Sequence, residues 1–250
     1  MDDTKLYIFG TPHNNFDLYQ GNENEINYFQ TFNNGSNENE KFTILRPTNG
    51  QVSYSYLRYN LISNSNVLGA FFGMSVVFNN GIYCTDVKSL YDLFKVVYSN
   101  ILQKNVLLKL ENDKTVFQVS KYEDAKDEIM RITSILEKNI RNNFVGDFKK
   151  LDPDFKQGIN LNKEKQMNYK ATNNAILLAM KEYPVVSVSP AYKAKVIIKN
   201  LPKETVERIQ KVESTVSVIQ SKDKWVIFWG VVAGFATIVL IMLFIGLWLK

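Results

Sequence analysis

Alternating apolar and polar positions divide the first 150 residues into short strand-like runs and two helix-like runs. The strand-like runs are rich in aromatic and β-branched residues, and turns containing Asn, Gly or Pro separate them, as expected for a sheet built from hairpins. They cover residues 5–10, 26–32, 41–46, 51–59, 67–78, 82–85, 106–110 and 115–119. The pattern predicts an antiparallel sheet of five to seven strands.

Segment 51–59 shows a period of two. One face carries Val52, Tyr54, Tyr56 and Arg58, and the other carries Gln51, Ser53, Ser55, Leu57 and Tyr59. The Asn49-Gly50 pair before this segment predicts a hairpin with 41–46. The run 67–78 is nearly all apolar, which predicts a central strand in which Gly69 and Gly73 mark a bulge or a close approach.

Two amphipathic helices are predicted, from 87 to about 103 and from about 122 to 143. Asp86 can cap the first, in which Leu90, Phe94, Val97 and Ile101 repeat at helical spacing. In the second, Ile129, Ile132, Leu136, Ile140 and Phe144 form one apolar stripe opposite a charged face. Because hairpins outnumber crossover helices, the fold class is α+β, with a first domain over residues 1–148.

A basic segment and a smaller unit follow this domain. Residues 149–170 are either a solvated linker or a stretch attracted to anionic lipid head groups. Residues 171–201 form a small α/β unit with a helix over 173–182 and strands over 185–189 and 195–199. Pro202 then opens a juxtamembrane helix over 202–224.

The juxtamembrane helix has an apolar seam at heptad a and d positions. Its members are Ile209, Val212, Val216 and Ile219. Two heptads suit either packing within the chain or a seam between chains. An intermolecular seam of β-branched residues favours assemblies larger than dimers.

Residues 225–249 contain no charged residue. Their length exceeds the roughly 20 residues that a helix needs to cross a bilayer, which predicts a single C-terminal transmembrane helix. Trp225, Trp229 and Trp248 suit the two headgroup layers, and Lys222 with Lys224 predicts that the N-terminal domain is cytoplasmic. We expect a single-pass membrane protein whose N-terminal domain lies on the cytoplasmic side.

Small residues on one side of the predicted span favour self-association. Gly230 and Gly234 lie four positions apart, with Ala233 and Thr237 beside them. Such spacing lets two helix backbones approach closely. A homo-oligomer in the lipid bilayer is therefore expected.

Composition argues against most enzyme classes. The chain has 250 residues, a formal net charge of +5, one cysteine and one histidine. Disulfides within the chain and the usual zinc sites are excluded, and a catalytic pair of Cys84 with His13 is not expected. Phosphate-binding loops and nucleotide fingerprints are absent from the sequence. The prediction is no enzyme, no cofactor and no nucleic-acid partner.

The stretch QVSYSYLRYNLISNSNVLGAFFGMSVVF, followed by YCTDVKSLYDLF, resembles the N-terminal domain of bacterial conflict (anti-phage defence) proteins. The resemblance covers roughly residues 1–150 and implies an adaptor or sensor module. Two functions follow. One is a defence effector, whose domain senses a protein or small-ligand trigger and whose span perturbs the inner membrane. The other is a tail-anchored scaffold or adaptor with a longin-like sheet, which recruits a partner.

Overall fold

The computed structural model describes residues 4–19, 26–32, 39–46, 50–152, 155 and 163–190. The chain divides into two units, residues 1–193 and 194–250, and the second lies outside the described residues. The strands are β1 Thr4–Gly10, β2 Asp17–Tyr19, β3 Glu40–Leu45, β4 Val52–Ile62, β5 Leu68–Phe78, β6 Ile82–Cys84, β7 Leu108–Glu111, β8 Lys114–Phe117, β9 Phe148–Lys150, β10 Glu164–Asn168 and β11 Val185–Ser189. The helices are α1 Tyr28–Phe32, α2 Val87–Lys104, α3 Lys126–Asn143 and α4 Asn173–Glu182, and a 3-10 turn, Tyr122–Ala125, precedes α3.

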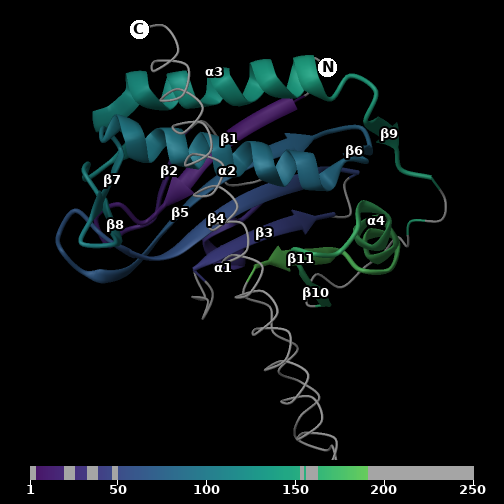
Figure 1. The fold of residues 1–250 in the computed structure, drawn as a ribbon, viewed down its shortest axis with the longest axis horizontal. Coiled ribbons are helices and arrows are strands. Elements are labelled where there is room, and N and C mark those ends of the chain that lie inside the picture. The colour runs from purple at the N-terminus through teal and green to yellow at the C-terminus, as the bar shows by residue number, and fades with distance from the viewer. Residues whose placement is uncertain are drawn as a thin grey trace, which may run out of the picture. The chain divides into compact units, whose positions relative to one another are not determined.

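One large sheet organises the described residues (Figure 1). Its strand order is β10-β11-β3-β4-β5-β1-β2, and the β7–β8 hairpin joins through β8, which pairs with β4. The α+β class is confirmed. The sheet is not wholly antiparallel, however, because β10 pairs with β11 and β8 with β4 in parallel. With nine strands among the described residues, it is also larger than predicted.

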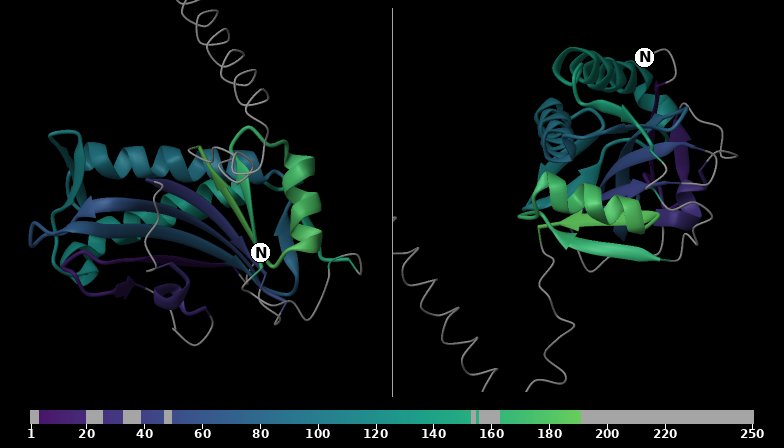
Figure 2. Two further views of the ribbon diagram at one scale, coloured as in Figure 1. Left: turned by 90° about the horizontal axis from the view of Figure 1, so that it is seen from below. Right: turned by 90° about the vertical axis from the view of Figure 1, so that its right-hand side faces the viewer.

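Helices cover both faces of the sheet (Figure 2). Helices α2, α3 and α4 pack on one face, in a core that includes Tyr54, Tyr56 and Phe72. Helix α1 packs on the other face, over Leu57 and Tyr59. The period-two pattern of 51–59 is confirmed, because Val52, Tyr54 and Tyr56 enter the first core, and Leu57 and Tyr59 enter the second.

The two long helices form as predicted. The Asp86 carboxylate accepts a hydrogen bond from the Ser89 amide (3.2 Å), and α2 ends at Asn105, which has a left-handed backbone. The apolar stripe of α3, from Ile129 to Phe144, is buried. These helices follow from local periodicity, which the fold does not override.

The central strand β5 also follows the prediction. Gly69 lies at the break in register between β4 and β5, with a φ of 107°. A Cβ on Gly73 would clash with the ring of Phe9. One glycine therefore allows the bulge and the other the close approach.

The sequence predicted a strand over segment 26–32. The structure instead has the short helix α1 at the end of this segment. The Asn27 side chain accepts a hydrogen bond from the Gln30 amide (2.9 Å) and so caps the turn. Tyr28 and Phe32, four residues apart, then face the sheet together, and both rings lie beside Phe9. Burial of two aromatic rings on one helical face outweighs the strand preference of this segment.

Residues 164–189 extend the same sheet instead of forming part of a separate unit. Strand β11 pairs with β3 along four residues, and β10 forms the sheet edge. The Lys41 ammonium contacts the Glu164 carboxylate at 2.7 Å, which ties β10 to β3 across β11. The predicted linker 149–170 therefore contains a strand, and the predicted boundary at 148 does not separate two sheets.

The predicted strand 195–199, the juxtamembrane helix and the C-terminal span lie outside the described residues. None of the helices within the described ranges combines the length and the apolar character needed to cross a bilayer.

Candidate functional site

Cys84 and His13 do not form a catalytic pair in the described structure. Cys84 is fully buried in β6, and burial raises the pKa of its thiol to about 12. Its backbone N–H donates to the Tyr54 hydroxyl at 2.9 Å, which donates in turn to the Cys84 carbonyl at 3.2 Å. His13 is exposed in the loop between β1 and β2. The described residues also contain no group of three or more His, Cys, Asp or Glu side chains placed to hold a metal ion.

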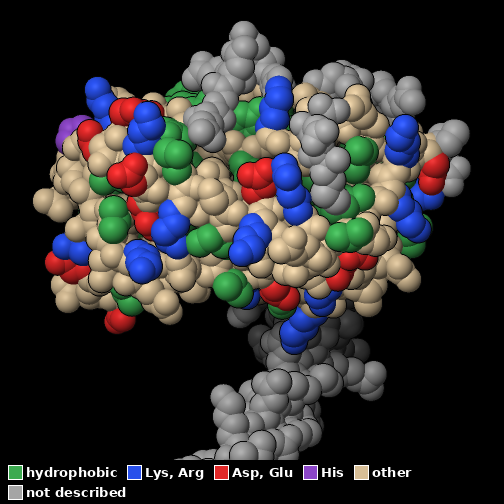
Figure 3. Space-filling view, turned by 90° about the horizontal axis from the view of Figure 1, so that it is seen from above, with side chains coloured by type: hydrophobic (Ala, Val, Ile, Leu, Met, Phe, Trp, Pro, Cys, Tyr) green, Lys and Arg blue, Asp and Glu red, His purple; other side chains and the backbone are tan. Residues whose placement is uncertain are grey.

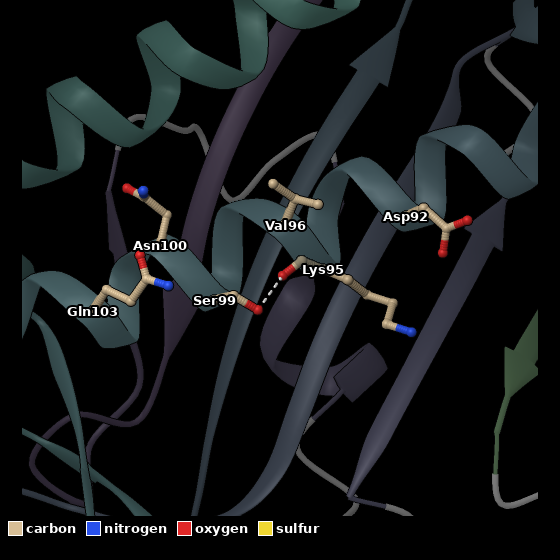
Figure 4. A pocket seen from close by; sticks show the side chains of 6 residues that line it. All are labelled: Asp92, Lys95, Val96, Ser99, Asn100 and Gln103. Atoms are coloured by element: carbon tan, nitrogen blue, oxygen red, sulfur yellow. Dashed lines mark hydrogen bonds between the residues drawn. The ribbon is translucent and has the colours of Figure 1, made fainter. Parts of the chain in front are cut away.

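A shallow hollow lies on the outward side of α2. We call its lining the α2 surface: Asp92, Lys95, Val96, Ser99, Asn100 and Gln103. Figure 4 shows Val96 and Asn100 on the side of the helix that faces α3, with Asp92 and Lys95 on the other side. Val96 is 66% exposed, although it is aliphatic. The surface is thus a polar row with one apolar side chain in its middle.

The spacing of these residues follows from the amphipathic pattern of α2. Leu90, Phe94 and Ile101 point into the core, so the positions between them turn outward. The Ser99 hydroxyl donates to the Lys95 carbonyl at 3.0 Å, which leaves its oxygen available as an acceptor. The same periodicity that buries one face of α2 therefore exposes the row.

Helix α3 supports one flank of the α2 surface. The Arg131 guanidinium donates to the Asn100 side-chain oxygen at 2.8 Å. It also contacts both oxygens of Glu128, at 2.6 and 2.7 Å. A guanidinium held by two such bonds has little freedom, so it fixes the orientation of the Asn100 amide.

Tyr169, after β10, supports the other flank. Its hydroxyl donates to the Asp92 carboxylate at 2.6 Å, and the Lys95 and Lys88 ammonium groups lie 5.0 and 5.2 Å from its ring centre. The hydrogen bond to Asp92, together with burial, raises the pKa of Tyr169 to about 12. Like an ordinary tyrosine, Tyr169 is protonated at neutral pH, and its hydroxyl acts as the donor to Asp92.

A charged network beneath α2 holds the helix to the sheet. The Glu40 carboxylate accepts from the Arg58 guanidinium at 2.7 Å and from the Tyr91 hydroxyl at 2.6 Å. The Arg58 guanidinium lies over the Tyr98 ring, 5.0 Å from its centre. Burial, followed by the hydrogen bond to Glu40, raises the pKa of Tyr91 well above its usual range. Because Tyr91 and Tyr98 belong to α2, the network fixes both the position and the rotation of the helix.

The sequence pattern placed Arg58 on the same face of β4 as Val52, Tyr54 and Tyr56, but its partners were not predicted. The available signal was the charge itself, because a buried guanidinium requires a carboxylate or several acceptors nearby. Its partner Glu40 precedes it by 18 residues, on the neighbouring strand. The sequence contains no recognisable motif at Tyr169, at Arg131 or along the row on α2.

The site residues predicted from the sequence all lie outside the described residues. They are the span face Gly230, Gly234, Ala233 and Thr237, the seam Ile209, Val212, Val216 and Ile219, and the interface anchors Trp225, Trp229, Trp248, Lys222 and Lys224. They stay predictions.

The α2 surface suits a protein partner better than a small ligand. A ligand site usually encloses 70–90% of its ligand, whereas these lining residues all come from one face of one helix. Basic and acidic side chains are interspersed on the face shown in Figure 3, so that face does not present a single-sign field for nucleic acid. Comparison of the chain with protein-family models, with curated proteins and with solved structures finds no match.

Proposed function

We propose that this chain is a C-terminally anchored membrane adaptor, whose cytoplasmic domain docks a partner protein through the α2 surface. The observation that carries this proposal is that α2 is held from three sides while its outer row stays open. The three supports are the Glu40–Arg58 pair, the Arg131 side chain and the Tyr169 hydroxyl. A surface held rigid before binding loses little entropy on binding, which favours recognition through a small set of contacts.

The topology supports the adaptor proposal. Five neighbouring strands at one side of the sheet have the order β2-β1-β5-β4-β3, with α1 on one face and α2 and α3 on the other. This arrangement resembles the longin-like sheet expected for an adaptor. Resemblance of fold alone does not establish a function, so the proposal depends on the α2 surface.

The membrane anchor is part of the same proposal. Residues 225–249 would span a bacterial inner membrane and leave the N-terminal domain in the cytoplasm. Deletion of 225–250 should release the protein from membranes. In intact spheroplasts, external protease should leave the described residues uncut, and cleavage within them would contradict the orientation.

Photocrosslinking from the α2 surface tests docking. A photoreactive amino acid at Val96 should capture a specific protein in cells, whereas the same group at Val145 provides a matched control. Val145 is also an exposed valine, at 72%, in the turn between α3 and β9. The captured protein should move to the soluble fraction when 225–250 is deleted. Absence of a crosslink specific to Val96 would refute docking at this surface.

A defence effector is the second candidate, favoured by the small-residue face of the span. Self-association through Gly230 and Gly234, with the seam from Ile209 to Ile219 gathering the chains, would let the spans perturb the membrane. Gly230→Ile with Gly234→Ile should then abolish depolarisation after a trigger. If the protein is instead an adaptor, the membrane potential should stay unchanged in both the wild type and this variant, with or without the trigger.

A further inference from the structure

The turn between β4 and β5 carries apolar side chains outward at one end of the sheet. Val67 is 50% exposed and Leu68 61%, and we call residues 63–68 the β4–β5 tip. We propose that the β4–β5 tip inserts into the interfacial layer of an anionic bilayer and so orients the domain on the membrane. This inference rests on the membrane anchor of the proposed function, but it does not require docking at the α2 surface.

Hydrogen bonds hold the β4–β5 tip in one shape. The Ser63 amide donates to the Val67 carbonyl at 2.9 Å, and the Val67 amide donates to the Ser63 hydroxyl at 3.2 Å. From outside the tip, Pro12 accepts from the Asn64 amide at 2.7 Å, and Ser120 donates to the Asn64 side chain at 3.0 Å. Because the backbone is fixed, Val67 and Leu68 cannot fold back onto the core, and several polar groups of the turn already have partners. Both features lower the cost of entering a layer poor in water.

The chain around the β4–β5 tip carries no charge. Between Arg58 and Asp86 there is no Asp, Glu, Lys or Arg. A charged group would oppose insertion strongly, whereas Val and Leu favour it. The composition of this long hairpin therefore matches the environment proposed for its end.

The neighbouring β7–β8 hairpin extends the apolar end and adds basic residues. Ile62 of β4 pairs with Val116 of β8, and Leu110 on β7 is 60% exposed. Lys109 and Lys114 lie in the two strands of this hairpin and Lys104 ends α2 just before it, against two carboxylates, Glu111 and Asp113. Three lysines against two acids leave a small basic excess, which suits a surface containing anionic lipid.

The size of the exposed patch argues against a second copy of the chain as its occupant. A stable protein interface buries about 800 Å² on each partner, far more than two half-exposed aliphatic side chains provide. The β4–β5 tip also lacks the Trp, Tyr and Arg side chains that dominate protein interfaces. A bilayer needs only local insertion, because the predicted span supplies most of the attachment.

The direction of β11 agrees with this orientation. Its residue Val188 pairs with Phe42, and Glu40, two residues before Phe42, pairs with Arg58 on the strand that leads to the tip. Thus β11, the last described strand, points toward the end of the sheet that carries the β4–β5 tip (Figure 1).

Lipid quenching of a fluorophore on the full-length protein tests the inference. The variant Val67→Cys, labelled with a thiol-reactive dye, is placed in nanodiscs of 70% phosphatidylcholine and 30% phosphatidylglycerol that contain lipids brominated near the headgroup. Cys84 is fully buried, so it should not compete for the dye. Val145→Cys is the matched control, since Val145 is exposed in the turn between α3 and β9, and Figure 1 shows β9 at the opposite end of the fold from the β7–β8 hairpin. Dye at position 67 should be quenched, and dye at position 145 should not.

A second variant separates insertion from simple proximity. Leu68→Asp places a charge on an exposed side chain of the β4–β5 tip, so the variant should still fold. The charge should reduce the fraction of protein whose tip is inserted in the bilayer about tenfold. Equal fluorescence at positions 67 and 145 in protein that resists alkaline extraction would overturn the inference while leaving the anchor intact. A dye at position 67 that is shielded from water but not quenched by brominated lipid would identify a protein contact and would also overturn it. Protein that alkali extracts from the nanodisc lipids would refute the anchor, and the inference with it.

Discussion

Asn173 joins the last described helix to the start of α2, and its removal should loosen that junction. Its side-chain NH₂ donates to the Asp86 carboxylate at 2.7 Å, and its side-chain oxygen accepts from the Lys88 amide at 2.9 Å. Burial alone would raise the pKa of Asp86, but hydrogen bonds from Ser89 and Asn173 outweigh it, and the pKa is lowered. Asn173→Ala removes both contacts at once.

The expected cost follows from the two hydrogen bonds. A bond to a charged group contributes about 1.5–3 kcal/mol and a neutral bond about 1 kcal/mol, and water can replace part of both at this half-buried site. We expect a loss of about 2 kcal/mol in the local stability of the first turn of α2. Asn174→Ala is the matched control, because Asn174 is the next residue in α4, is exposed and gains a similar helix propensity from alanine.

Hydrogen exchange of the full-length protein in nanodiscs measures the difference. Amides in the first turns of α2 and α4 should exchange about thirtyfold faster in Asn173→Ala than in Asn174→Ala, since each 1.4 kcal/mol changes the opening equilibrium tenfold. Asp86→Ala should produce a similar loss, and the double variant should lose less than the sum. Equal protection in the two asparagine variants would refute the docking of α4 on α2.

Three further predictions concern the sheet and its core. Gly10→Ala should destabilise the domain by about 3 kcal/mol or more, measured as a fall in melting temperature, because a Cβ there would clash with the Phe71 carbonyl and the φ of 154° disfavours other residues. The pKa of Glu164 lies below 4.5 because hydrogen bonds, chiefly from Lys41, outweigh the effect of burial. The stability that the ionised Glu164 carboxylate contributes should be complete above pH 4.5 and should be lost as the pH falls through the lower, folded-state pKa. Amide hydrogen exchange in β10 should therefore become faster only in acid. Glu164→Gln should remove this acid-dependent increase. Cys84 should react with maleimide at pH 8 only after denaturation, because burial raises its thiol pKa to about 12; rapid labelling of the native protein would contradict the packing of β6.

Local periodicity was enough to predict most elements of the first 150 residues. In α2, Leu90, Phe94 and Ile101 recur at helical spacing, and all three are buried. In β4, Tyr54 and Leu57 fall on opposite faces because successive side chains alternate in any strand. These features depend on residues close together in the chain, so sequence reasoning can reach them.

Some elements have no characteristic local sequence pattern, and tertiary packing determined their structure. Strand β10 has the sequence EKQMN, which is polar and lies at the sheet edge, where backbone pairing with β11 defines it. Helix α1 formed because the rings of Tyr28 and Phe32 could both pack against Phe9, although its sequence also suited a strand.

The candidate site depended still more on distant pairings. The Thr43 and Ser187 hydroxyls lie 3.1 Å apart across β3 and β11, although 144 positions separate them. The same pairing brings Tyr169 to Asp92, and the β3–β4 register brings Glu40 to Arg58. The sequence by itself determined which faces are apolar and where the uncharged C-terminal run lies. Only the fold could decide which charged and hydroxyl groups meet, because such contacts depend on pairings that have no period along the chain.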